Sequence, residues 1–174
     1  IIEEQGVDMD VILKLYKDNV EQQGINTVSG KFFGYIAPCS MFYSALGDYI
    51  AAITDPFSVD YAASPGAVHM EKMLLDWMAD LVGYPAGVQG NLASGGSLAT
   101  LICIVTARES HGLKARDFDK AVVYITELTH HCVKKGLHVA GMGECVIRYV
   151  PVDDAYRMKA DALAECIEND RQQG

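Results

Sequence analysis

The run Ser94-Gly95-Gly96-Ser97 is the first stretch whose residue types could bind a ligand. Apolar residues follow it at helical spacing, so the run stands at the expected start of a helix. Glycine lets a backbone approach an anion closely, and a helix start offers free N–H groups and the positive end of the helix dipole. Two interpretations follow: an anion cradle, or a capped helix after a tight turn. The spacing matches neither the P-loop nor the dinucleotide-binding fingerprint.

The second stretch is Thr129-His130-His131-Cys132, which comes directly after the β-branched run of residues 121–126. In α/β proteins, active-site groups lie beyond the carboxyl ends of strands, which is where these residues fall. Three interpretations are open: a structural histidine, a histidine that faces a ligand, or a zinc site. Zinc is the least favoured, because adjacent residues rarely point into one coordination sphere and no Cys-x-x-Cys pair accompanies them. No metal is therefore expected.

An aromatic segment, Phe32-Phe33-Gly34-Tyr35-Ile36, is the third candidate. Aromatic side chains at the edge of a domain usually pack against its core. They can also form one wall of an apolar substrate pocket. Both interpretations are open from the residues alone.

Helical and strand patterns must position these stretches. A strand, a helix and a second strand within about 30 residues form a βαβ unit, so the sheet is predicted to be mainly parallel. The fold class is therefore α/β, with a helical N-terminal arm over residues 1–58 and an α/β domain over residues 59–174. The Met-rich helix near residues 65–82 is expected to be core. Helices are predicted near residues 9–23, 40–55, 65–82, 98–110, 131–140 and 161–171, and buried strands at 121–126 and 145–150.

Composition and charge exclude several classes of function. The 174 residues include 23 acidic and 14 basic ones, a formal net charge of −9. The basic residues are scattered, so no nucleic-acid-binding face is expected. No apolar run reaches the length of a membrane helix, and acidic residues stand where a signal peptide would have basic ones. The five cysteines form no close pairs, which favours a reduced, cytoplasmic protein.

Taken in order, these motifs resemble the group II decarboxylases that depend on pyridoxal phosphate (PLP), a family that includes the aromatic-L-amino-acid, histidine and glutamate decarboxylases. The resemblance covers residues 8 to 174, and it rests on six modest motifs in the right order. The matching features are Phe32-Phe33-Gly34-Tyr35, Ser64-Pro65 with Glu71 and Asp76-Trp77, Ser94 to Thr100, Ala107-Arg108, His130 after its strand, and Arg157-Met158.

The resemblance implies PLP as the cofactor and the first part of a PLP-dependent transferase-like (fold type I) large domain. Gly95, Gly96 and Ser97 match the family's phosphate cradle. His130 matches the imidazole that stacks on the pyridine ring and is the candidate catalytic residue. The implied chemistry is decarboxylation of a small-molecule L-amino acid, with the ring as electron sink.

The resemblance also implies a substrate pocket and an assembly. Tyr35 and Pro38 fall in the segment that lines the family's substrate pocket. Ser64-Pro65 and Asp76-Trp77 look closer to the aromatic-amino-acid decarboxylases than to the glutamate decarboxylases or sphingosine-phosphate lyases. The family's N-terminal arms pack across a homodimer, so a homodimer is expected, with no nucleic-acid or membrane partner.

Some positions depart from the family pattern. His131 and Cys132 stand where small hydroxyl residues are usual, which leaves the exact substrate open. The family's Schiff-base lysine follows a histidine, and none of the nine lysines here does so. This sequence is therefore expected to be the N-terminal portion of an enzyme and inactive alone. The alternatives are a catalytically dead PLP-fold interaction module and a small zinc-binding α/β domain.

Overall fold

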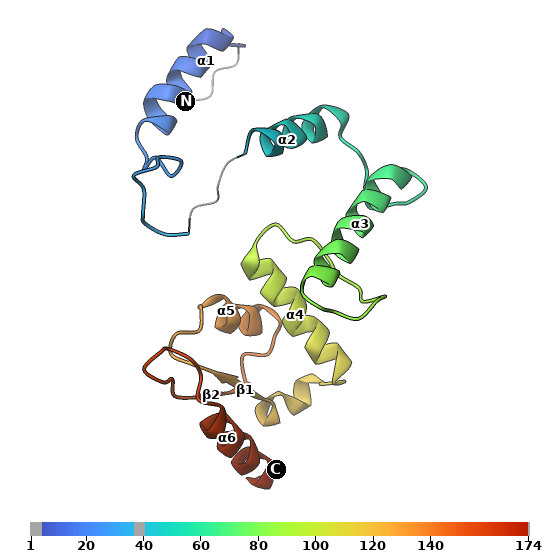
Figure 1. Ribbon diagram of the computed structural model, residues 1–174, viewed down its shortest axis with the longest axis vertical. Helices are drawn as coiled ribbons and strands as arrows, with labels where there is room; N and C mark the ends of the chain where they lie inside the picture. Colours follow the sequence, from blue (N-terminus) through green and yellow to red (C-terminus); the bar gives the residue numbers. More distant parts are fainter. Residues whose placement is uncertain (1–4, 37–40, 174) are drawn as a thin grey trace. The chain divides into compact units, whose positions relative to one another are not determined.

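The computed structural model describes residues 5–36 and 41–173 (Figure 1). The chain divides into two compact units, Ile1–Val68 and His69–Gly174. Each unit is described below by itself. The proposed domain boundary after residue 58 stays a prediction.

The first unit consists of helices and connecting turns. Helix α1 (Met9–Tyr16) is capped by Asp8, whose carboxylate accepts the Asp10 N–H over 2.9 Å, and a π-helical turn (Lys17–Glu21) extends it. Helix α2 (Phe42–Thr54) has Met41 at its N-cap, while Ser40, the predicted cap, lies outside the described residues. It ends at Asp55, whose φ of 41° is left-handed. None of the side chains described in this unit is buried.

The second unit contains the predicted α/β pattern. Helix α3 (Pro65–Leu81) begins at the junction of the units with proline at its first position, where a missing N–H costs little. Gly83, with φ of 76°, turns the chain just beyond its end. The elements that follow are α4 (Gly96–Ser110), the 3₁₀ helix η2 (Ala115–Lys120), β1 (Val122–Ile125), α5 (Cys132–Val139), β2 (Val146–Tyr149) and α6 (Ala160–Gln173).

Strands β1 and β2 pair in parallel, with Val122 opposite Val146 and Ile125 opposite Tyr149. Helix α5 makes the crossover between them, so the βαβ unit and the α/β fold class predicted from the sequence are confirmed. Each strand is one residue shorter at either end than the apolar run that predicts it. Because the strands are parallel, their carboxyl ends lie at one edge of the sheet.

A core cluster of buried side chains includes residues of α5 and η2. It consists of Phe118, Leu137, Met142 and Cys145, against which residues of α4 and both strands pack. Phe118 lies on η2, a 3₁₀ helix in a stretch for which the sequence analysis predicts neither a helix nor a strand. The charged residues of this stretch follow no helical period, so its one buried aromatic residue gives little local signal.

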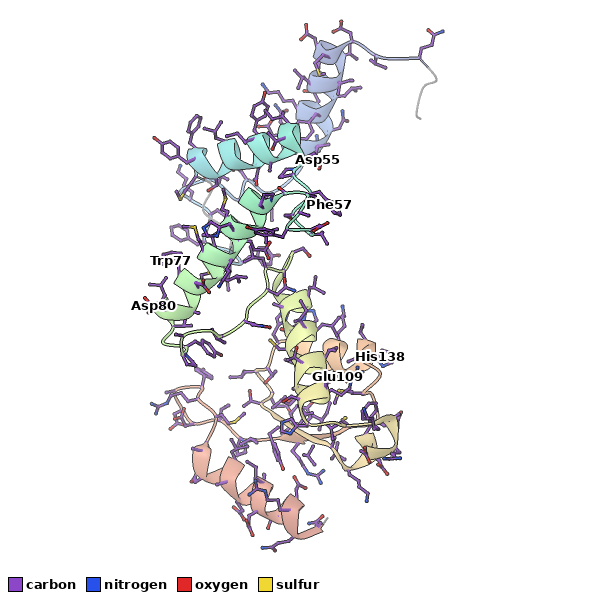
Figure 2. The ribbon with its side chains drawn as sticks, turned by 90° about the vertical axis from the view of Figure 1, so that its right-hand side faces the viewer. Asp55, Phe57, Trp77, Asp80, Glu109 and His138 are labelled. Carbon is purple, nitrogen blue, oxygen red and sulfur yellow. The ribbon has the colours of Figure 1, made fainter. Side chains whose placement is uncertain are left out.

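The predicted role of α3 as core is wrong for the described residues. Met70, Met73 and Trp77 are 65%, 58% and 59% exposed. Figure 2 shows Trp77 and Asp80 projecting from this helix. The helical spacing is real, but the described residues do not cover the apolar face. Among them, no helix is long and apolar enough to cross a membrane.

Candidate functional site

The start of α4 is an open cradle of backbone N–H groups. Gly95 is the N-cap, and no side chain caps the helix. Within the described residues, the N–H groups of Gly96, Ser97 and Leu98 have no hydrogen-bond partner, and the first bond of the helix runs from Ala99 N–H to Gly95 O. Of the two interpretations of the glycine run, the arrangement favours the anion cradle.

Space at the cradle matches this interpretation. A Cβ atom built on Gly95 or Gly96 would meet no atom within 4 Å. The glycines are therefore not required by packing inside the chain, and their surface is open to an incoming group. A phosphate fits such a site, because free N–H groups and the helix dipole both favour an anion.

A tight turn joins β1 to His130. The Thr126 N–H donates to Thr129 Oγ1 over 2.9 Å, and the Thr129 N–H donates back to Thr126 O over 3.0 Å. The Leu128 N–H donates to Thr126 Oγ1 over 3.2 Å. Two threonines thus satisfy the backbone of the turn and set the direction in which the chain leaves the strand.

His130 lies directly after this turn, with an exposed side chain. Its carbonyl accepts the Val133 N–H over 3.2 Å, and its Nδ1 accepts the Cys132 N–H over 3.3 Å. The ring of His131 lies with its centroid 4.1 Å from that of His130, tilted by 38°. The hydrogen bond to Nδ1 and the neighbouring ring of His131 therefore restrain the His130 ring, and its Nε2 edge stays open.

Helices α4 and α5 bring the cradle and the histidine to the same edge of the sheet. The two helices run in the same direction and touch along their length, with Thr100 Oγ1 3.6 Å from Cys132 Sγ near the two N-termini. Halfway along the pair, Gly136 of α5 faces α4. Near the C-termini of the two helices, Arg108 Nη1 donates to Ala140 O over 3.0 Å. Figures 1 and 2 show the pair side by side, and Figure 2 labels Glu109 on α4 and His138 on α5.

A hollow of about 210 Å³ lies between α4 and α5 and is lined by residues of both helices. Its lining includes Ser97 from the cradle and Cys132, two residues after His130. The structure thus places Ser97 beside Cys132. The cofactor-binding roles of Gly95, Gly96, Ser97 and His130 stay predictions. The full lining is Ser97, Leu98, Leu101, Cys132, Lys135, Gly136 and Val139.

The predicted substrate residues lie elsewhere in the chain. Tyr35 belongs to the first unit, where its side chain is 89% exposed and its ring centroid lies 6.3 Å from that of Phe32. Its φ of 57° is left-handed, which is uncommon for a tyrosine. Pro38 lies outside the described residues. The substrate-binding roles of both stay predictions.

The zinc interpretation finds no support in the part of the chain that the structure describes. There, no three His, Cys, Asp or Glu side chains gather as metal ligands would. His130 Nδ1 is instead engaged by a backbone N–H.

One polar cluster in this unit escaped the sequence analysis. Arg148 on β2 donates to Asp170 on α6, with Nη2 2.8 Å from Oδ1, and Tyr124 on β1 donates to Asp170 Oδ2 over 2.9 Å. The hydrogen bond from Arg148, followed by that from Tyr124, holds the pKa of Asp170 below its ordinary value. The available signal was a pair of polar residues inside two otherwise apolar strands. The cluster ties α6 to the sheet.

Comparison with known proteins agrees with this geometry. The family model described as the pyridoxal-dependent decarboxylase conserved domain matches residues 2–174. The chain is 28% identical to an aromatic-L-amino-acid decarboxylase of Bacillus atrophaeus over 99% of its length, and 31% identical to a histidine decarboxylase of Mus musculus over 80%. It covers 36% and 24% of those two proteins.

A solved structure shows the same fold. The tryptophan decarboxylase of Catharanthus roseus, in complex with L-tryptophan, matches all of this chain with a TM-score of 0.89 at 22% identity, and the chain covers 38% of it. At that identity the likeness concerns the fold. The match of the family model over nearly the whole sequence concerns descent, and it shows that the chain belongs to the pyridoxal-dependent decarboxylases, a family of carboxy-lyases whose cofactor is PLP.

Proposed function

We propose that the whole protein containing this chain is a PLP-dependent decarboxylase that acts on an L-amino acid. The single observation on which this rests is the family match over residues 2–174. The open N–H cradle of α4, beside the turn that presents His130, supports it independently. When bound, PLP supplies an electron sink for the negative charge left on the substrate as carbon dioxide departs.

Each predicted site residue has a proposed role, and for Gly95, Gly96, Ser97 and His130 the geometry described above supports it. The N–H groups of Gly96 and Ser97, with Gly95 beside them, bind the cofactor phosphate. The exposed ring of His130 contacts the cofactor ring and helps to orient the substrate. Tyr35 and Pro38 line the substrate pocket.

We propose an aromatic amino acid as the substrate. The aromatic-L-amino-acid decarboxylase of Bacillus atrophaeus matches nearly the whole chain, and the aromatic-like motifs Ser64-Pro65 and Asp76-Trp77 agree with it. The mouse histidine decarboxylase, at 31% identity over a shorter stretch, makes histidine the competing substrate. Carbon dioxide release from tyrosine, tryptophan, 3,4-dihydroxyphenylalanine, histidine and glutamate separates these classes.

We further propose a cytoplasmic homodimer whose Schiff-base lysine lies outside these 174 residues. The apolar residues of α1 and α2 support the dimer, because Met9, Phe42 and Ile53 are 65%, 78% and 63% exposed. Apolar surface of this kind marks an interface. Light scattering of the full-length protein tests the dimer.

The test of the cradle uses two glycines at helix starts in the full-length protein. Gly96→Val should raise the dissociation constant for PLP about tenfold or more, because the added side chain blocks backbone approach to the phosphate. Gly66→Val, at the second position of α3 and equally open, is the matched control and should leave PLP affinity unchanged. Equal PLP affinity in both variants would show that the cradle is misassigned.

The test of His130 is its replacement by alanine in the same protein. His130→Ala should lower turnover by at least tenfold while circular dichroism stays unchanged, because the exposed side chain contributes contact with the ligand rather than packing. Unchanged turnover would return His130 to a structural role.

A further inference from the structure

The imidazole of His130 makes one directional hydrogen bond. The backbone N–H of Cys132 donates to Nδ1 over 3.3 Å. An amide N–H can only donate, so Nδ1 is the acceptor and has no proton. A neutral imidazole has one N–H, which must then be on Nε2.

We infer that the backbone of Cys132 holds His130 in its Nε2–H tautomer, so that the histidine presents a hydrogen-bond donor to the bound ligand. This inference rests on the proposed function, in which His130 contacts cofactor and substrate. A neutral ring in this tautomer has no free lone pair at Nε2. It can therefore recognise only an acceptor atom there and cannot remove a proton from the substrate. Cys132 acts through its backbone as a positioning residue.

The Cys132 N–H is held in this bond by the start of α5. The first N–H groups of a helix have no partner within the helix. Here the N–H of Val133 reaches the carbonyl of His130, and that of Lys135 reaches the carbonyl of His131. For the Cys132 N–H, the partner found among the described residues is His130 Nδ1. Rotating the ring would leave this amide unpaired.

The same local geometry recurs in this chain with other acceptors. In each case an acceptor side chain takes the N–H of the residue two positions later, as in an Asx turn. The imidazole of His130 replaces the usual carboxylate oxygen. The carboxylate examples are Asp8 with Asp10, Asp60 with Ala62 and Asp153 with Ala155, at 2.9 Å each.

The opposite edge of the ring is available to a ligand. His130 is exposed, and within the described ranges its Nε2 has no hydrogen-bond partner. The ring of His131, 4.1 Å away between centroids, limits rotation from one side. The Nε2–H group is therefore a restrained donor that no group within the described chain uses.

Nitrogen NMR of the full-length protein tests the tautomer directly. With ¹⁵N-labelled histidine, the His130 signals are assigned by their loss in His130→Gln. We expect a protonated Nε2 and an unprotonated Nδ1, in the free protein and after PLP is added. A proton on Nδ1, in either a neutral or a charged ring, would overturn the inference.

Cys132→Ala is the control for the source of the restraint. It keeps the backbone N–H and removes the thiol, so the tautomer should be unchanged. A change of tautomer in this variant would show that the side chain, rather than the backbone, orients the ring.

Two amide replacements of His130 test the consequence for turnover. Glutamine places an NH₂ donor near the position of Nε2, whereas asparagine places its amide near Nδ1 and leaves the ligand side empty. We expect kcat of His130→Gln to exceed that of His130→Asn by about tenfold, the effect of one hydrogen bond to the ligand. Equal values, or a more active asparagine variant, would overturn the inference.

Failure of the inference and failure of the proposed function give different results. If the unmodified protein binds no PLP and releases no carbon dioxide from any amino acid, the proposed function fails. If it does both but the NMR spectrum shows a proton on Nδ1, only the tautomer assignment fails.

Discussion

Tyr156 has a left-handed backbone, with φ of 62°, in the short loop closed by the bridge between Val152 and Met158. The loop is held by the carboxylate of Asp153, which accepts the N–H groups of Ala155 and Arg157 over 2.9 Å each. These bonds, with the ion pair to Arg157, keep the pKa of Asp153 low, the backbone bond from Arg157 being the largest cause. The bonds made by Asp153 thus hold Tyr156 in a backbone conformation that a tyrosine disfavours.

Replacement of Tyr156 by glycine should stabilise the protein. A left-handed conformation costs a non-glycine residue about 1–2 kcal/mol, and the greater freedom of glycine in the unfolded chain offsets about 0.5–1 kcal/mol of the gain. The side chain is 75% exposed, so little packing is lost. We expect the free energy of unfolding of Tyr156→Gly to rise by about 0.5–1 kcal/mol, measured by urea denaturation of the full-length protein. Ala155→Gly, at a neighbour that is not left-handed, should give no gain.

Asp170 should make stability depend on pH. Its pKa is lowered in the folded state, so the stabilisation is complete above its unfolded pKa and is lost as pH falls through the folded pKa. The unfolding midpoint of Asp170→Asn should therefore lie below that of the parent at pH 7, and the difference should shrink below about pH 4. Glu165→Gln, on the exposed side of the same helix, is the control. A constant difference between pH 7 and pH 3 would contradict the role of the Arg148–Asp170 pair.

At the scale of elements, α4 and α5 form the packing unit that sets the site. Gly136 is buried in α5 and lies against α4, where a Cβ would meet Ile104 Cδ1 at 2.8 Å and Leu101 Cα at 3.8 Å. The absence of a side chain thus lets the helices approach closely. Thr100 and Cys132 meet at one end of the pair for the same reason.

Gly136→Ala should loosen this pair. Alanine is the better helix former by about 1 kcal/mol, but overpacking typically costs about 1–3 kcal/mol, so we expect a net destabilisation of about 1 kcal/mol. Ile104→Val removes the Cδ1 atom in question, and in that background Gly136→Ala should become neutral or stabilising. Gly66→Ala, with open space around it, should not destabilise. If the changes in unfolding free energy caused by Gly136→Ala and Ile104→Val simply add in urea denaturation, the contact between these two residues is contradicted.

At the scale of the whole chain, little apolar surface is covered. The buried apolar side chains of the described residues are Phe118, Ile125, Leu137, Met142, Cys145 and Val150, all in the second unit. Helices α1 to α4 have no buried residue. The relatives are longer proteins, and the chain covers 36% of the first of them.

The isolated 174 residues should therefore associate or require a partner chain. Exposed apolar surface of this extent favours association over a monomer. Light scattering coupled to gel filtration should show oligomers or aggregates, and PLP followed by borohydride should give no specific reduced PLP–lysine adduct. A monodisperse monomer would contradict the packing argument, and a specific adduct would contradict the proposed location of the lysine.

The sequence alone was enough for most of the local elements, though not for η2, and for the resemblance to the family. Apolar periodicity with Pro65 and Gly83 predicts α3, and two β-branched runs around a helix predict the parallel pair β1 and β2. The order of short motifs indicates the pyridoxal-dependent decarboxylases. These features are readable because each depends on residue types and their spacing along the chain rather than on which elements pack together.

The tertiary structure alone decided which of these elements meet. The contact of Thr100 with Cys132 joins residues 32 positions apart, and that of Tyr124 with Asp170 joins residues 46 apart. Neither leaves a periodic pattern in the sequence, because each depends on the direction of packed elements. The hydrogen bond from Cys132 to His130 is local, but it needs the turn at Thr126–Thr129 and the start of α5 to orient the ring. The residue types thus indicated the glycine run and His130 as candidate site residues, and the packing of α4 against α5 placed them at one edge of the sheet.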